Sequence, residues 1–185
     1  MVSAFLLITF GYFAGGIPFG VILAQLRGVD IREHGSGNIG ATNVTRVLGP
    51  VLGAMVLVLD AGKGALPTWY AIHHTPDPWV VVATGAAAIL GHCFSPFLGF
   101  SGGKGVATAT GVFLVLAPQQ LAIALVVFLA VLAWKRVPAL GSLAGIAALC
   151  VATWWRGDAW TATLALGTLG LLVYTHRSNL AKLTS

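Results

Sequence analysis

Long apolar stretches limit the folds open to this chain more than any other feature. Charged residues make up only 8% of its 185 residues and hydrophobic residues 57%. A run of about 20 apolar residues, rising about 1.5 Å each as a helix, spans the roughly 30 Å hydrocarbon core of a bilayer. We therefore predict an all-α integral membrane protein of one domain, residues 1–185. The predicted transmembrane helices, about seven in number, are residues 3–26, 50–72, 79–95, 104–117, 119–134, 139–155 and 159–174.

Charge placement distinguishes two topologies, because the fourth and fifth spans are short and could form one bent helix through Pro118. Lys and Arg favour short cytoplasmic loops. Seven spans with the N-terminus outside leave one loop cation outside, Arg156, whereas merging the two spans leaves four outside and five inside. The cations then inside are Arg27, Arg32, Arg46, Lys104, Lys135, Arg136, Arg177 and Lys182. We predict seven spans with the C-terminus in the cytoplasm.

Residues 35–46, Gly-Ser-Gly-Asn-Ile-Gly-Ala-Thr-Asn-Val-Thr-Arg, are unusually polar for such a chain. The glycine spacing matches a dinucleotide-binding fingerprint, but that motif needs a preceding strand, whereas a membrane helix precedes this one. Closely spaced glycines still let backbone N–H groups approach an anion, and an arginine can bind phosphate through two parallel hydrogen bonds. The alternative is a flexible glycine loop with an interfacial arginine. The candidate site residues here are Ser36, Gly37, Asn38, Thr42, Asn43 and Arg46.

A second glycine-rich segment, residues 100–108, leads into a predicted helix and contains Lys104. The first N–H groups of a helix are unpaired and lie at its positive end, which favours anions. The segment is not a Walker A loop, because no Ser or Thr follows the lysine. The alternative is a lysine that only anchors the loop in the cytoplasm. The candidate residues here are Gly102, Gly103, Lys104 and Gly105.

Two charged residues lie inside the second span. Asp60 and Lys63 are three residues apart, which places them on one helical face. Charges inside a bilayer are expensive, so they should pair or face a polar cavity. Lys63 therefore either binds substrate or forms an ion pair that fixes helix packing. In the first span, Gly11 with Gly15 predicts close helix packing.

The remaining candidates lie near predicted inner ends of spans: His92, Ser142, His176, Arg177 and Asn179. If four cations from separate segments converge, they can hold two phosphate-sized anions. These cations are Arg46, Lys63, Lys104 and Arg177. We expect no metal or cofactor, since the five acidic residues are ungrouped and Cys93 and Cys150 lack metal-ligand spacing. We expect no nucleic-acid partner, because the net charge of +5 forms no basic stripe.

Four segments together resemble the bacterial acyl-phosphate-dependent glycerol-3-phosphate acyltransferases: residues 35–46, 60–64, 91–108 and 176–183. The resemblance covers nearly the whole chain. It implies transfer of a fatty acyl group from acyl phosphate to the 1-hydroxyl of sn-glycerol 3-phosphate. The products are lysophosphatidate and phosphate, in the first acylation of phospholipid synthesis. It also implies a bacterial inner-membrane enzyme whose site faces the cytoplasm.

An acyl phosphate is already activated, so we expect direct transfer without an acyl-enzyme. The enzyme must then position two anions and stabilise the developing charge. We predict catalytic functions for Ser36, Arg46, His92, Lys104 and His176, and substrate binding by the other candidates. His92, His176 and the substrate's own phosphate are alternative proton acceptors.

We expect a monomer in the lipid bilayer, with an acyl-phosphate-producing enzyme as a candidate partner. The alternative function is a membrane carrier for phosphate or a phosphorylated metabolite, which the same cations could serve.

Overall fold

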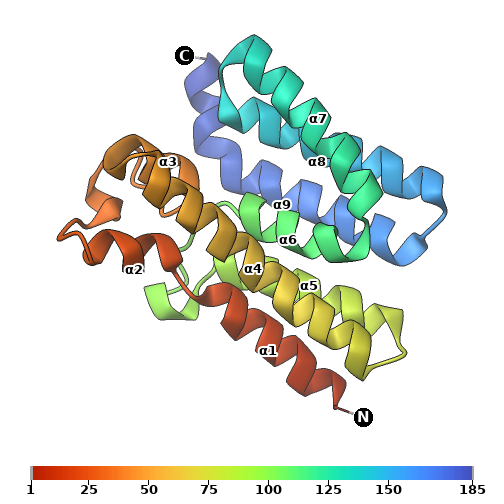
Figure 1. Ribbon diagram of the computed structural model, residues 1–185. Helices are drawn as coiled ribbons and strands as arrows, with labels where there is room; N and C mark the ends of the chain where they lie inside the picture. Colours follow the sequence, from red (N-terminus) through yellow and green to blue (C-terminus); the bar gives the residue numbers. More distant parts are fainter. Residues whose placement is uncertain (1, 185) are drawn as a thin grey trace. The chain divides into compact units, whose positions relative to one another are not determined.

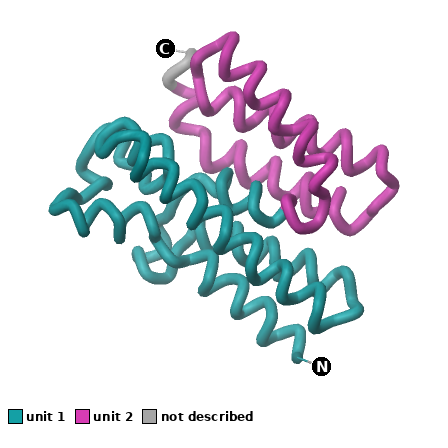
Figure 2. The backbone as a smooth tube through the Cα atoms, viewed as in Figure 1, with its two compact units in different colours: residues 1–112 teal, residues 113–185 magenta. Residues whose placement is uncertain are grey.

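The computed structural model describes residues 2–184, and the side chains of residues 2–181. The side chain of Lys182, counted above as an inner cation, thus lies outside the described part. Contacts divide the chain into two compact units, residues 1–112 and 113–185 (Figure 2). Each unit is described by itself, and the single domain over residues 1–185 stays a prediction.

Helices account for all regular structure within residues 2–184 (Figure 1). Unit 1 contains α1 (Ala4–Gly16), α2 (Phe19–Gln25), η1 (Ile31–Glu33), α3 (Ala41–Leu48), α4 (Pro50–His74), α5 (Pro78–Cys93) and η2 (Pro96–Leu98). The helix α6 (Val106–Leu116) crosses the boundary between the units. Unit 2 contains α7 (Pro118–Lys135), α8 (Pro138–Arg156) and α9 (Ala159–Thr184).

Every predicted span contains a helix, which confirms the all-α class. Five segments within the described residues are long and apolar enough to cross a membrane: Ala4–Gln25, Pro50–His74, Pro78–Leu98, Pro118–Lys135 and Pro138–Arg156. The helix α6 is short at 11 residues, and the 26-residue α9 is less apolar. The count of seven spans and their orientation therefore stay predictions. Where these two spans meet, α6 ends at Leu116 and α7 begins at Pro118.

Close packing of α1 on α5 explains the glycines of the first span. Gly11 lies against the backbone of Thr84, and a Cβ on Gly15 would overlap the carbonyl of Ala88. The prediction that these glycines serve helix packing is confirmed. The residue numbers rise together along both helices, so α1 and α5 run parallel. Their C-terminal ends, and the loops that follow them, therefore lie at the same end of unit 1.

The first span is broken in its second half, where the sequence predicts one helix over residues 3–26. Pro18 has no N–H group to continue a helix, and α1 ends at Gly16 before α2 begins at Phe19. The carbonyl oxygens at this break find side-chain donors. Ser95 Oγ donates to Gly16 O at 2.6 Å, and Lys63 Nζ donates to Ile17 O at 2.7 Å.

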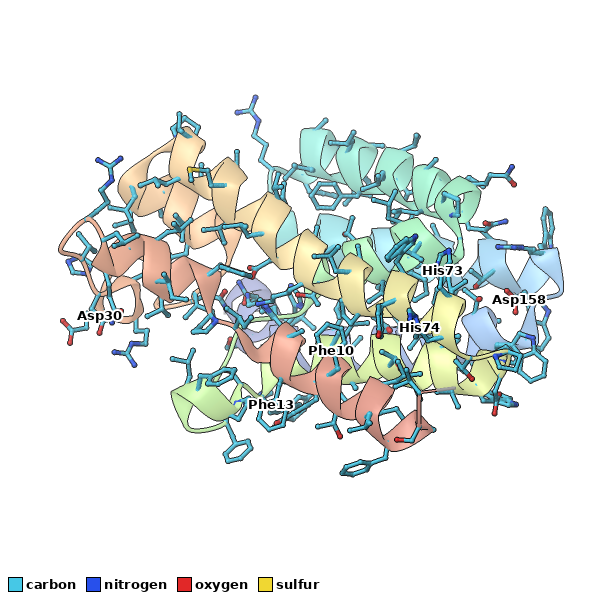
Figure 3. All side chains as sticks on the ribbon, turned by 60° about the horizontal axis from the view of Figure 1, so that its bottom comes forward. Phe10, Phe13, Asp30, His73, His74 and Asp158 are labelled. Atoms are coloured by element: carbon cyan, nitrogen blue, oxygen red, sulfur yellow. The ribbon has the colours of Figure 1, made fainter. Side chains whose placement is uncertain are left out.

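The opposite end of unit 1 contains stacked aromatic rings at the end of α4. His74 stacks on Tyr70 with ring centroids 3.7 Å apart, and Phe10 of α1 meets Tyr70 edge-on at 5.9 Å (Figure 3). Phe10 thus lies level with Tyr70, whereas Ile17 lies level with Lys63. Hence α4 runs antiparallel to α1, and its first turns lie at the same end as the two loops.

The last helix is longer than predicted. The sequence predicts a span that ends at residue 174, with His176 to Asn179 after it. Instead α9 continues to Thr184. Hydropathy marks the part of a helix that suits lipid, and a helix can continue beyond it because its backbone bonds are internal.

Candidate functional site

The side-chain amide of Asn43 organises the loop that precedes α3. Asn43 is only 2% exposed. Its Nδ2 lies within hydrogen-bonding distance of the carbonyls of Ile31, His34 and Asn38, at 3.4, 2.9 and 2.9 Å. Its Oδ1 accepts from the N–H of Ser36 at 2.8 Å. One buried amide thus holds four backbone groups, which indicates a positioning function for Asn43 where the sequence suggested substrate binding.

The glycines of this loop serve its turns. Gly35 and Gly37 have φ angles of 62° and 71°, which glycine adopts without steric penalty. The N–H of Gly37 donates to His34 O at 3.0 Å, and that of Gly40 donates to Asn38 Oδ1 at 2.9 Å. These N–H groups, with that of Ser36, are engaged within the loop. A nest of free N–H groups, as the glycine spacing predicted, is therefore not formed by these three.

Groups that could bind an anion are instead the side chains at the surface of this loop and of α3. Ser36, Thr42 and Arg46 are exposed. Arg46 Nη1 donates to Asn43 Oδ1 at 3.3 Å, so the buried amide also contacts the guanidinium. Asn43 and Arg46 are three residues apart on α3, which keeps them on one face of that helix.

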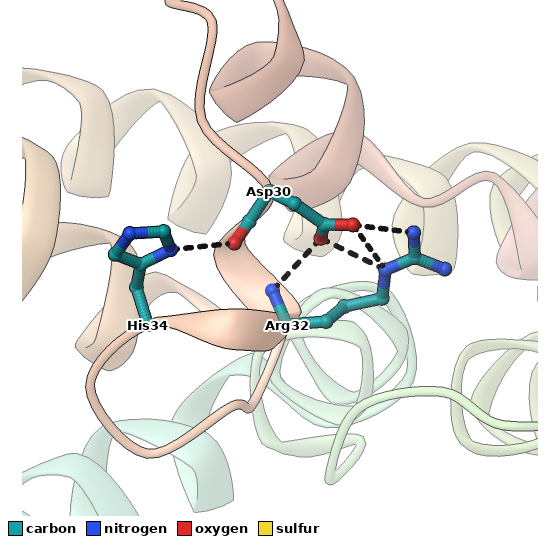
Figure 4. A network of polar contacts seen from close by, with 3 residues as sticks. All are labelled: Asp30, Arg32 and His34. Carbon is teal, nitrogen blue, oxygen red and sulfur yellow. Dashed lines mark hydrogen bonds and ion pairs between the residues drawn. The ribbon is translucent and has the colours of Figure 1, made fainter.

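The start of the loop is closed by an exposed ion pair (Figure 4). Arg32 Nη2 lies 2.6 Å from Asp30 Oδ2, and His34 Nδ1 lies 2.9 Å from the carbonyl of Asp30. Hydrogen bonds from the Arg32 side chain and backbone lower the pKa of Asp30 to about 2. Asp30 therefore stays ionised at neutral pH and caps the short helix η1.

The second glycine segment is packed against the end of α5. The N–H of Gly103 donates to His92 O at 3.0 Å. A Cβ on Gly102 would overlap the same carbonyl, and one on Gly103 would overlap the imidazole ring of His92. Lys104 is half-buried and lies two residues before the first turn of α6. This placement agrees with the predicted anion site at the start of a helix.

A buried charged cluster lies beneath the second segment. Lys63 Nζ is 2.7 Å from Asp60 Oδ1, and the two side chains are 3% and 2% exposed. His92 Nδ1 lies 3.8 Å from the same carboxylate oxygen. Lys63 also donates to Ile17 O at the α1–α2 break. Of the two possibilities for Lys63, these contacts favour the packing ion pair.

One hydrophobic cluster lies under both polar loops. Its buried members come from α2, η1, α3, α4 and the first loop: Val21, Ala24, Ile31, Ile39, Val44 and Val56. Leu98 of η2 packs against them. The helix α3, which carries Arg46, and the short helix η2, which precedes Lys104 by six residues, thus pack on one hydrophobic cluster at one end of unit 1.

The candidates of unit 2 lie on α8 and α9. Ser142 Oγ donates to Pro138 O at 2.9 Å within α8. His176 is 3% exposed, and its Nδ1 lies 2.8 Å from Leu172 O. Because a carbonyl only accepts, Nδ1 carries the proton of this hydrogen bond. Arg177 is exposed and stacks on Tyr174, with its guanidinium carbon 4.2 Å from the ring centroid. Asn179 is half-buried one turn after His176.

Two residues that were not predicted from the sequence, Tyr12 and Ser95, fix the segment after α5 to the α1 region. Ser95 donates to Gly16 O, as described above, and the hydroxyl of Tyr12 donates to Phe94 O at 2.7 Å. Both bonds join the α1 region to the segment after α5. Pro18 inside an apolar run was the available signal, because a proline predicts a break whose carbonyls need donors.

The buried ion pair generates a stability prediction. Lys63→Met leaves Asp60 buried and unpaired, which should destabilise the protein by about 3–5 kcal/mol. Asp60→Asn combined with Lys63→Met should regain part of this loss, since no lone charge then exists. Thermal unfolding in detergent measures both. Asp30→Asn, which breaks the exposed pair, is the control and should shift the midpoint far less. Equal shifts for Lys63→Met and Asp30→Asn would contradict the interpretation.

A second prediction concerns the loop that Asn43 holds. Asn43→Ala removes the acceptor of the Ser36 N–H and the donor to three carbonyls, at a loss of about 1–3 kcal/mol. Hydrogen exchange of the Ser36 amide should accelerate roughly tenfold to a hundredfold. The exposed neighbour Thr42→Ala is the control and should leave this rate unchanged. A wild-type exchange rate in Asn43→Ala would show that the amide does not organise the loop.

Comparisons with known proteins identify the family of the chain. A family model described as glycerol-3-phosphate acyltransferase matches residues 5–185. A glycerol-3-phosphate acyltransferase of Myxococcus xanthus (strain DK1622) is 53% identical over 186 residues, covering 99% of this chain and 96% of the relative. One of Aquifex aeolicus (strain VF5) is 40% identical over 183 residues, covering 98% and 95%.

Two solved structures have the same fold. Both are of PlsY (YgiH), described as an integral membrane glycerol 3-phosphate acyltransferase. Its glycerol 3-phosphate form gives a TM-score of 0.95 at 40% identity, covering 99% of this chain and 92% of that one. Its lysphosphatidic acid form gives 0.93 at 39% identity with the same coverage. The all-α integral membrane fold and the resemblance seen in the sequence are confirmed, and the chain belongs to the glycerol-3-phosphate acyltransferase family.

Proposed function

We propose that this enzyme transfers a fatty acyl group from acyl phosphate to the 1-hydroxyl of sn-glycerol 3-phosphate, and releases lysophosphatidate and phosphate. The observation that carries the proposal is that α3, which carries Arg46, and the segment that leads to Lys104 both pack on one hydrophobic cluster of unit 1. Two phosphate groups, one from each substrate, require two such contacts. The related structures are described as a glycerol 3-phosphate form and a lysphosphatidic acid form, molecules that differ by one acyl group.

In this proposal, polar and charged side chains of unit 1 contact the two phosphate groups. Arg46, with Ser36 beside it, binds one phosphate, since a guanidinium can donate two parallel hydrogen bonds to it. Lys104 and the first turn of α6 bind the other. Together they offset the repulsion between two anions and stabilise the charge that develops on the carbonyl and leaving phosphate. Arg177 and Asn179 orient glycerol 3-phosphate.

Direct transfer fits the state of two serines and of both cysteines. Ser95 and Ser142 both donate to backbone carbonyls. Cys93 is buried, and Cys150 is half-buried in α8. An activated donor needs no covalent nucleophile. We therefore expect no acyl-enzyme, and the acceptor hydroxyl attacks the donor carbonyl while phosphate leaves. The site faces the cytoplasm of a bacterial inner membrane, where glycerol 3-phosphate is dissolved.

The experiment that tests this function uses purified protein in detergent with labelled glycerol 3-phosphate and palmitoyl phosphate. Lysophosphatidate and phosphate should appear in equal amounts. Acyl-CoA and acyl-carrier protein in place of the acyl phosphate should give no product, and labelled donor alone should leave no acyl group on the protein. Uptake of glycerol 3-phosphate into liposomes without product would instead support a carrier.

Arg46 should be indispensable for turnover. Arg46→Ala is expected to lower kcat/KM by about a hundredfold or more, because a charge aimed at a phosphate is lost. Arg46→Lys should recover only part, since lysine lacks the planar pair of donors. Arg32→Ala, an exposed arginine of the same loop, is the control. Thermal unfolding should show all three variants folded, and an active Arg46→Ala would refute this assignment.

The two buried histidines should differ in their pH profiles. We assign the base to His176, whereas His92 lies under Gly103 and acts by holding the loop. His176→Gln should lower kcat by about a hundredfold to ten-thousandfold and abolish the acidic limb of the kcat–pH profile. His92→Gln should lower activity but keep that limb. An acidic limb that survives in His176→Gln would refute this assignment, and its loss in His92→Gln would then distinguish His92 from the substrate phosphate as the base.

A further inference from the structure

Residues 96–100, between α5 and Lys104, carry two large apolar side chains that the fold does not bury. Phe97 is 56% exposed and Phe100 is 65% exposed. Leu98, between them, packs against the hydrophobic cluster beneath the polar loops. The segment is therefore anchored on one side and presents two aromatic rings on the other.

The backbone holds Phe100 in an unfavourable conformation. Its φ is 62°, in the left-handed region that bulky residues rarely adopt, and Gly99 before it has φ 60°. The N–H of Phe100 donates to Ser95 O at 2.8 Å, and that of Ser101 donates to Leu98 O at 3.2 Å. Such strain persists where surrounding bonds fix it, and it is frequent at ligand contacts.

The exposed aromatic surface of α1 extends to this segment. Phe97 meets Phe13 edge-on, with ring centroids 6.2 Å apart. Phe13 and Phe10 lie on α1 and are 49% and 47% exposed (Figure 3). They belong to the candidate membrane span Ala4–Gln25. Phe97 thus continues the exposed apolar surface of this span, and Phe100 extends the same segment toward Lys104.

The same segment is close in sequence to the proposed phosphate contact. Phe100 and Lys104 are four positions apart in the sequence, so their Cα atoms are at most about 14 Å apart. This distance lies within the reach of a long fatty chain whose head group is at Lys104. We propose that Phe97 and Phe100 form the contact surface for the hydrocarbon chain of the acyl donor. The inference rests on the proposed function, in which that donor is a fatty acyl phosphate.

Donor chain length provides the test. The variant Phe97→Ser/Phe100→Ser should lose about tenfold or more in kcat/KM with palmitoyl phosphate, because apolar contact with the chain is lost. With butyryl phosphate, whose chain is too short to reach both rings, the change should stay below about twofold. Phe5→Ser, at the far end of α1 and 74% exposed, is the matched control and should alter neither value. Equal losses with both donors, or no loss with either, would overturn the proposal.

A second measurement decides the membrane contact without turnover. Phe100→Trp, compared with the wild type and its six tryptophans, should show added fluorescence that phospholipids brominated on their acyl chains quench. Added fluorescence that these lipids do not quench would overturn the inference. If the wild type fails to use palmitoyl phosphate at all, the proposed function fails, and the quenching result still reports on the aromatic surface.

Discussion

Two carbonyl oxygens at the break between α1 and α2 determine how the neighbouring helices of unit 1 pack there. At membrane depth a carbonyl without a donor is expensive, so a broken helix needs partners from its neighbours. Ser95 supplies one donor from the segment after α5, and Lys63 supplies the other from α4. Lys63 can be buried because Asp60 neutralises it. The proline that interrupts the first span thereby ties three helices together at the level where the polar loops begin.

Buried and exposed polar groups have separate functions in this end of the molecule. Asn43 and His92 are buried, and each fixes the backbone of a polar loop. Asn43 accepts a hydrogen bond from the N–H of Ser36, and the ring of His92 packs against Gly103. Arg46 and Ser36 lie above and have side chains at the surface. A cation on a fixed base can meet a phosphate without first ordering a loop, which lowers the entropic penalty of binding.

The sequence predicted the helices well, because apolar length is a local property. It failed at Pro18, where a hydropathy run continues although the hydrogen-bonding pattern does not, and at the end of α9, where the helix outlasts its apolar part. Asn43 and Lys63 were found as unusual residues, but their partners were not. The partners of Asn43 depend on positive φ angles at Gly35 and Gly37, and those of Lys63 on a carbonyl 46 residues away. Neither can be inferred from spacing along the chain.

The continuity of α9 through His176 and Asn179 limits how the sequence of this enzyme can vary. His176 and Asn179 lie within α9, and Asn179 follows about one turn later. An inserted or deleted residue between them would rotate every later side chain by about 100° around the axis. A loop could absorb such a change, whereas a helix cannot. Homologous chains should therefore differ in length before Ala159 or after Thr184, with the three-residue interval kept constant.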